Sequence, residues 1–274
     1  MHQLPPFLLF SSLSLMFFIL SASATNSLIY GGCSQLRFSP GTPYELNANS
    51  LFTSLVNSAS VSNFKISTSG SSQSNVVYGL FQCEGDLSNS MCKDCVASAM
   101  SQLKKICPEA AGGVIQIEGC LVKYDNTSFF GVEDKTEVSK RCGPSIGYSS
   151  DALNRRDAAL ASLTAANGQY FRGGGSGSVR GVAQCLQDLS VSQCQDCLVE
   201  ASGRLSSECE TSTWGDMFLG KCYIRYVDRE HHSRTDDEDV DKTLALTIGV
   251  ITGVILLIIF LSSLSKLCNK KGGK

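Results

Sequence analysis

Histidine is scarce in this sequence of 274 residues, and all three occurrences lie outside its cysteine-rich region, residues 25–230. That region therefore has no imidazole to activate a serine or cysteine nucleophile. It also shows no pair of carboxylates of the kind that a glycosidase needs. We expect no catalytic residues, and we interpret His231 and His232 as solvated linker residues rather than metal ligands. His2 belongs to an apolar N-terminal stretch.

A strong charge of either sign is also missing. The sequence has 23 Lys and Arg against 25 Asp and Glu, a formal net charge of −2. A protein that binds nucleic acid usually carries a basic surplus on one face. We therefore predict no nucleic-acid partner, and no motif indicates a cofactor.

Cysteine, in contrast, is abundant, and twelve of the thirteen residues form two repeated sets. Five cysteines of the first set recur 102 residues later, and one further cysteine precedes each group of five. The sets are Cys33, Cys83, Cys92, Cys95, Cys107 and Cys120, then Cys142, Cys185, Cys194, Cys197, Cys209 and Cys222. Cys-x2-Cys also fits zinc ligation or thioredoxin-type chemistry. An even, repeated set favours disulfides in an extracellular tandem duplication, so we predict no metal site.

Two apolar runs flank the duplicated region and indicate a membrane protein. Residues 5–20 precede a small-residue pattern at 22–24, so we expect residues 1–24 to be a cleaved signal peptide. Residues 244–264 are 21 residues without a charge, enough for a helix of ~31 Å. Acidic residues precede this run and lysines follow it, which predicts a type I single-pass protein with extracellular modules.

Several smaller signals accompany the predicted span. Gly249 and Gly253 are four residues apart, a spacing that allows membrane helices to pack closely. Cys268 is a candidate for palmitoylation, with an unmodified thiol as the alternative. Asn126 begins the single glycosylation sequon, and we predict that it is modified. The ten residues 265–274 are too few for a folded domain, so we expect no attached kinase.

The predicted domains are a first module at 25–132, a second at 133–230, an acidic juxtamembrane linker at 231–243, the span at 244–264 and a cytoplasmic tail at 265–274. Apolar residues at helical spacing predict a first helix at 47–59, and near Leu153 to Leu163 behind Ser150 or Asp151. Gly/Ser-rich stretches at 67–74 and 173–178 are interpreted as flexible loops.

A second helix is expected to begin near Ser90 and near Ser192. Strands are expected at 76–83, 114–124, 179–185 and 217–227. On the helix of the first module, six residues share one predicted buried face, namely Cys92, Cys95, Val96, Ala99, Leu103 and Ile106. The fold class is therefore α+β, with two helices on a small antiparallel sheet in each module. The connection at 133–141 is short, which favours a fairly rigid pair.

The spacing Cys-x8-Cys-x2-Cys resembles the plant DUF26 or ginkbilobin-2-like module. Gln82-Cys83 followed by Asp86-Leu87-Ser88, and Gln184-Cys185 followed by Asp188-Leu189-Ser190, strengthen the resemblance. Two such modules with one span and a very short tail resemble the plasmodesmata-located proteins. The residues alone leave 15 pairings open in each module. The resemblance implies Cys33–Cys107, Cys83–Cys92, Cys95–Cys120, Cys142–Cys209, Cys185–Cys194 and Cys197–Cys222.

The resemblance also indicates which positions would form a sugar-binding site. The mannose-binding ginkbilobin module holds the sugar with an Asn, an Arg and a Glu. The matching positions in this sequence are Ser34, Val114 and Asp125, and then Gly143, Asp216 and Val227. Only Asp125 keeps the charge type of its counterpart, so we expect no mannose binding at these positions.

By resemblance, the protein is expected at the plasma membrane of plasmodesmata, as a non-enzymatic regulator of cell-to-cell movement. Callose-linked closure, defence signalling and docking of viral movement proteins come with that expectation. One alternative is a membrane-tethered lectin, antifungal or specific for a cell-wall glycan, and another is a kinase-less co-receptor. The expected partners are similar membrane proteins in a homo- or hetero-oligomer, a receptor kinase, a viral movement protein or a wall glycan.

Overall fold

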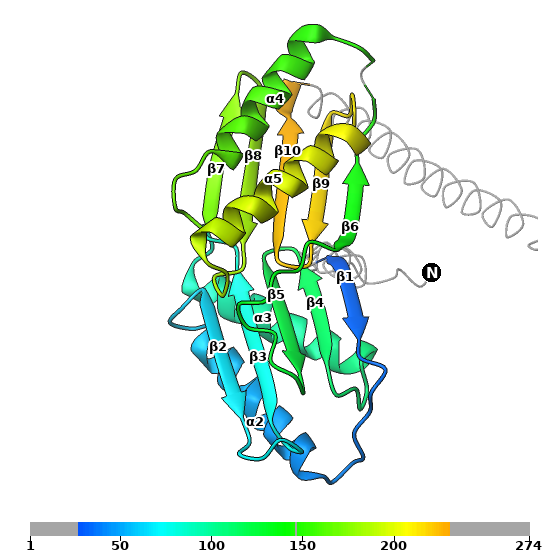
Figure 1. Ribbon diagram of the computed structural model, residues 1–274, viewed down its shortest axis with the longest axis vertical. Helices are drawn as coiled ribbons and strands as arrows, with labels where there is room; N and C mark the ends of the chain where they lie inside the picture. The colour runs from blue at the N-terminus through cyan, green and yellow to red at the C-terminus, as the bar shows by residue number, and fades with distance from the viewer. Residues whose placement is uncertain (1–26, 146, 231–274) are drawn as a thin grey trace, which may run out of the picture.

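The computed structural model describes residues 27–145 and 147–230, and these form two modules of one architecture (Figure 1). Each module is a five-stranded antiparallel sheet with two helices packed on one face, as predicted for the α+β class. Module 1 contains β1 (Leu28–Cys33), α2 (Pro43–Ser58), β2 (Phe64–Ser69), β3 (Val77–Cys83), α3 (Asn89–Ile106), β4 (Gly113–Ile117) and β5 (Cys120–Asp125). Module 2 contains β6 (Glu137–Cys142), α4 (Ser150–Thr164), β7 (Phe171–Ser176), β8 (Val179–Cys185), α5 (Val191–Glu208), β9 (Trp214–Leu219) and β10 (Cys222–Asp228).

The strand orders are β1-β4-β5-β3-β2 and β6-β9-β10-β8-β7, so the sheets are copies of one another. Within the described ranges, no helix is long and apolar enough to cross a membrane. Several predictions fall outside these ranges and stay predictions, namely those on residues 1–24, His231, His232, the span at 244–264 with Gly249 and Gly253, and Cys268.

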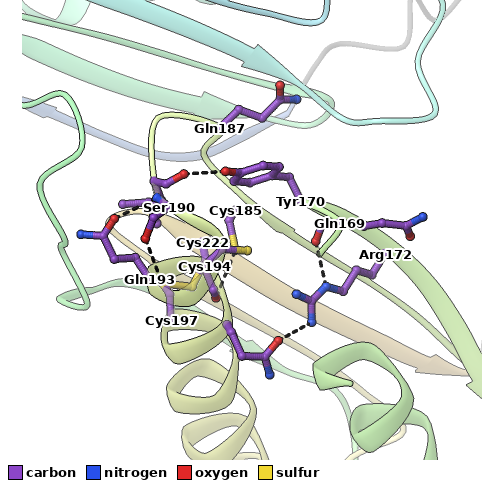
Figure 2. Close-up of a disulfide and its surroundings, with 12 residues drawn as sticks. Gln169, Tyr170, Arg172, Cys185, Gln187, Ser190, Gln193, Cys194, Cys197 and Cys222 are labelled. Carbon is purple, nitrogen blue, oxygen red and sulfur yellow. Dashed lines mark hydrogen bonds between the residues drawn. A yellow bond between two sulfur atoms is a disulfide. The ribbon is translucent and has the colours of Figure 1, made fainter. Parts of the chain in front are cut away.

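The second helix of each module begins behind a serine cap. The Ser88 hydroxyl accepts a hydrogen bond from the Met91 amide, and Ser190 forms a reciprocal capping box with Gln193 (Figure 2). Caps of this kind satisfy amides that have no partner in the first helical turn. The two helices accordingly start one residue before the predicted Ser90 and Ser192.

The other helix boundaries need small corrections. α2 begins at Pro43 rather than 47, because a proline in the first turn gives up no helical hydrogen bond. Ser149, rather than Ser150 or Asp151, caps α4. Ile106 is 43% exposed, contrary to its predicted burial. It is the last residue of α3, and its side chain lies against β1, where a Cβ at Gly31 would be 2.7 Å from Ile106 Cδ1.

The prediction of loops at the Gly/Ser-rich stretches is correct only in part. Residues 67–69 and 173–176 belong to the edge strands β2 and β7, whereas 70–74 and 177–178 form the turns that follow. β7 pairs with β8 along its whole length. A Cβ at Gly174 would lie 2.5 Å from Ser162 Oγ, and one at Gly181 would lie 2.7 Å from Leu163 Cδ1. The glycines therefore let α4 approach the sheet closely, and they do not serve to make the chain flexible.

Disulfides fasten the second helix of each module to its sheet. The six bonds are Cys33–Cys107, Cys83–Cys92, Cys95–Cys120, Cys142–Cys209, Cys185–Cys194 and Cys197–Cys222, the same pairs that the resemblance implies. In module 2, Cys194 lies in the first turn of α5 and is bonded to Cys185 at the end of β8 (Figure 2). Beside it, the Tyr170 hydroxyl donates to the Leu189 carbonyl at 2.6 Å. Covalent and hydrogen bonds thus fix the same end of the helix.

The helices of the two modules lie on opposite sides of the molecule. In Figure 1, α4 and α5 lie in front of their sheet, whereas α2 and α3 lie behind theirs. The helix-free faces of the two sheets meet where the modules join. There Leu80 and Leu121 pack with Leu186 of module 2 in a small shared core. Beside it, the Tyr30 and Phe218 rings meet edge to face at 6.5 Å.

The connection between the modules is held by a buried ion pair. The Lys221 ammonium donates to the Asp188 carboxylate, and both side chains are 2% exposed or less. Lys221 also donates to the Phe129 carbonyl at 3.0 Å, and Asp188 accepts the Gly131 amide at 3.0 Å. The connection runs over residues 126–136, between β5 and β6, because residues 137–141 of the predicted link form part of β6. Since Phe129 and Gly131 belong to this connection, the pair ties it to module 2.

We predict that Lys221→Ala destabilises the ectodomain by about 3–5 kcal/mol, because it leaves the Asp188 carboxylate buried without its cation. Lys140→Ala is the matched control, since Lys140 pairs with Glu208 while 37% of its side chain is exposed. That loss should be much smaller, because the pair is exposed to solvent. Urea unfolding of residues 27–230 without reductant measures both. Equal losses in the two variants would show that the buried pair does not hold the connection.

Candidate functional site

The junction is built around two glutamines at equivalent positions of the repeat. Gln82 donates to the Cys185 carbonyl at 2.7 Å, and Gln184 donates to the Cys83 carbonyl at 3.0 Å. Both glutamine side chains are buried. The two bonds are reciprocal, so the modules are related by an approximate two-fold arrangement at this point. Each bond also gives a donor to a buried backbone carbonyl, because a buried carbonyl without a hydrogen bond lowers the free energy of unfolding.

Next to the glutamines lies a network of charged side chains. Asp216 on β9 is opposite Arg225 on β10 and opposite Arg141 on β6. Its carboxylate accepts from Arg225 Nε at 3.0 Å and from Arg141 Nη2 at 2.8 Å. Glu118 of module 1 accepts from Arg225 Nη1 at 2.8 Å, and from Arg141 at 3.3 Å. Two arginines and two carboxylates therefore neutralise one another across the junction.

Two glutamates at the junction have pKa values shifted in opposite directions. Burial would raise the pKa of Glu118, but its hydrogen bonds and charge interactions with Arg225 and Arg141 lower that pKa below the ordinary value of 4.5. Burial raises the pKa of Glu84 above 4.5, and the Arg225 charge offsets this only in part. Ionised Glu118 is therefore favoured at the junction, whereas ionised Glu84 is disfavoured.

The positions that the resemblance associates with mannose come close together in each module but bring the wrong groups. In module 2 the Gly143 amide donates to the Trp214 carbonyl, and Val227 is paired with Trp214. Asp216, two residues further on, is already bonded to two arginines. In module 1 the Ser34 amide donates to the Gly112 carbonyl, beside which the Asp125 carboxylate lies. Val114 supplies no donor there.

A groove with a volume of about 650 Å³ opens on the helix-free face of module 2. Its lining includes the charged network and, further from the junction, Arg180, Val227, Trp214 and Arg229. We did not predict Arg180, Trp214, Arg225 or Arg229 as site residues from the sequence. One signal was present, because Trp214 is the only tryptophan of the chain.

The predicted glycosylation site lies at the end of a strand. Asn126 directly follows β5 and is partly exposed, and the Thr127 hydroxyl of the sequon lies 3.4 Å from its side-chain oxygen. Its glycosylation stays a prediction. In the part of the chain that the structure describes, no group of three or more His, Cys, Asp or Glu residues could hold a metal ion.

These features define a class of protein with two cysteine-rich, disulfide-bonded modules joined through their helix-free sheet faces. Residues 32–127 and 142–229 each match the model of the salt stress response/antifungal family, Stress-antifung. The fold agrees with the crystal structure of the tandem DUF26 ectodomain from the Arabidopsis thaliana cysteine-rich receptor-like protein PDLP5. The TM-score is 0.70 at 42% identity, over 73% of this chain and 99% of that one.

Two curated relatives extend the match along the chain. Plasmodesmata-located protein 6 of Arabidopsis thaliana is 52% identical, over 93% of this chain and 93% of its own length. Plasmodesmata-located protein 7 of the same plant is 49% identical, over 95% of this chain and 93% of its own length. The chain belongs to the plasmodesmata-located protein family.

The opposite pKa shifts predict opposite effects of two substitutions. The stabilisation from ionised Glu118 is fully present above pH 4.5 and is lost as the pH falls below it, because the folded-state pKa is lowered. The parent should therefore exceed Glu118→Gln in stability most clearly above pH 4.5, and the difference should shrink in acid. For Glu84 the folded-state pKa is raised, so the parent should lose stability relative to Glu84→Gln as the pH rises through 4.5.

Urea unfolding between pH 3 and pH 7 measures both differences. The two variants serve as controls for one another, since each removes one carboxylate from the same junction. If the stability difference between parent and variant changed with pH in the same direction for Glu118→Gln and Glu84→Gln, the opposite pKa shifts would be contradicted.

Proposed function

We propose that this chain is a non-enzymatic, single-pass membrane protein of plasmodesmata that regulates the movement of molecules between cells. The observation that carries the proposal is the match to plasmodesmata-located proteins 6 and 7, which extends over more than nine-tenths of the chain and well beyond the two modules. The apolar run at 244–264 supplies the proposed membrane anchor, with the modules outside the cell.

The architecture supports a role in recognition rather than chemistry. Two modules held by six disulfides and a bonded junction present a rigid surface. We infer that signals reach the cell interior through partners in the same membrane, such as a second copy, a related protein or a receptor kinase. Callose-linked closure, defence signalling and docking of viral movement proteins belong to the same proposal.

Imaging tests the location. The full chain with a fluorescent protein at its C-terminus should give paired spots across walls between adjacent leaf cells, at the sites of a plasmodesmal marker. The same chain without residues 244–264 should be secreted and spread evenly through the wall space. Spread of a free fluorescent protein from single cells should differ between cells with and without the chain. Uniform labelling of the plasma membrane with unchanged spread would contradict the proposal.

Association in the membrane is expected to depend on Gly249 and Gly253. Both glycines lie on one face of the proposed span, where a larger side chain keeps a second helix at a distance. Gly249→Ile with Gly253→Ile should lower energy transfer between two fluorescently tagged copies, while secretion of the modules continues.

Gly272→Ile with Gly273→Ile is the matched control, because these glycines follow the span. It should leave energy transfer unchanged. Equal energy transfer in the parent and in the Gly249/Gly253 variant would mean that the modules alone carry any contact between copies.

A further inference from the structure

The groove of module 2 contains one row of side chains that the charged network does not use. Val227 on β10 is paired with Arg180 on β8 and with Trp214 on β9. This register places an arginine and a tryptophan on either side of a valine, two strand spacings or ~10 Å apart. The indole lies directly over Gly143, where a Cβ would be 2.5 Å from two of its ring atoms. Glycine at this position therefore makes room for the ring.

The charge of this end of the groove is positive. Four arginines and two carboxylates line the groove, and Arg141 and Arg225 already pair with both carboxylates. Arg180 and Arg229 are exposed, and neither forms an ion pair with any residue that the structure describes. Arg180 uses one nitrogen, Nη1, on the carbonyls of Gly177 and Val179. Its guanidinium keeps further donors for an anion.

The geometry points to a ligand that is both flat and anionic, and we propose that the groove binds an oligosaccharide that contains uronic acids. The apolar face of a pyranose ring packs on Trp214 and Val227, and the carboxylates of adjacent sugars pair with Arg180 and Arg229. Guanidinium groups recognise carboxylates with two parallel hydrogen bonds, and pockets that combine an aromatic surface with few polar groups favour small ligands of this kind.

The corresponding face of module 1 does not offer this site. The row there contains Tyr78 paired with Asp125, without an arginine. The connection also folds over this face, so that the Phe130 ring meets Tyr78 at 5.8 Å and the Phe129 ring meets Lys123 at 4.8 Å. The described residues therefore form one such site per chain, and the site requires neither the proposed location nor a role in transport.

The single tryptophan allows a direct test on the full chain in detergent. Titration with trigalacturonate should change the Trp214 fluorescence to saturation, with one site by calorimetry. Arg180→Gln with Arg229→Gln should weaken binding about tenfold or more, as expected for the loss of charged hydrogen bonds. Arg204→Gln is the matched control, because Arg204 pairs with Glu200 on α5, away from the groove, and it should bind like the parent.

Four results would overturn the proposal. One is equal binding of the methyl-esterified trisaccharide, which keeps the rings and removes the charge. Another is equal or tighter binding of a peptide with the acidic sequence 236–241, which would assign the groove to a protein segment. A third is equal weakening by Arg204→Gln, which would indicate attraction to overall charge. The last is unchanged binding by Trp214→Leu in calorimetry, with unfolding curves to confirm the fold, because loss of the indole should weaken binding.

Discussion

The two reciprocal bonds from Gln82 and Gln184 are the contact on which the rest of this structure depends. Each amide reaches the carbonyl of a cysteine in the other module, and each of these cysteines ends a strand and is bonded to the second helix of its own module. The junction is therefore connected directly to both disulfide frameworks. A displacement of one module relative to the other would leave two buried carbonyls without these donors, and this cost in free energy opposes movement at the junction.

The charged network extends this constraint to the edge of the groove. Asp216 accepts hydrogen bonds from arginines on both neighbouring strands, and Glu118 of module 1 accepts a hydrogen bond from Arg225. The charged side chains of the groove are consequently paired with one another nearest the junction. Further out, Arg180 keeps donors that no described residue uses. Two roles thus fall on different residues of the strand β10. Arg225 stabilises the junction, and Val227 lies at the centre of the proposed binding site.

The sequence predicted the duplication, the helices and the α+β class, because these depend on local spacing. Helical periodicity around Cys92 and Cys95 predicted α3, and the Ser88 cap sets its start in the structure. β1 and β6 were missed, since short edge strands with exposed residues have no clear alternation and form through pairing with β4 and β9. The residues alone left the disulfide pairing open, and only the resemblance selected the pairs that the structure contains.

The candidate site was less accessible to prediction. Asp216 was interpreted as the loss of a family arginine, whereas its role follows from Arg225 and Arg141, which lie 9 and 75 residues away and meet it only through strand register. Lys221 gave no signal either. A lysine between a glycine and a cysteine is unremarkable until the fold brings Asp188 and the Phe129 carbonyl to it.

The path of the connection has a consequence for how such a duplication can evolve. Two copies in tandem start with the same sequence, but a linear chain has only one connection between them. In this structure the connection covers the helix-free face of the first copy with Phe129 and Phe130. Substitutions on that face are constrained by the segment above it. The second copy carries no such cover among the described residues, so its face can change without disturbing the join. The place of a copy along the chain therefore decides whether the connection covers its helix-free face.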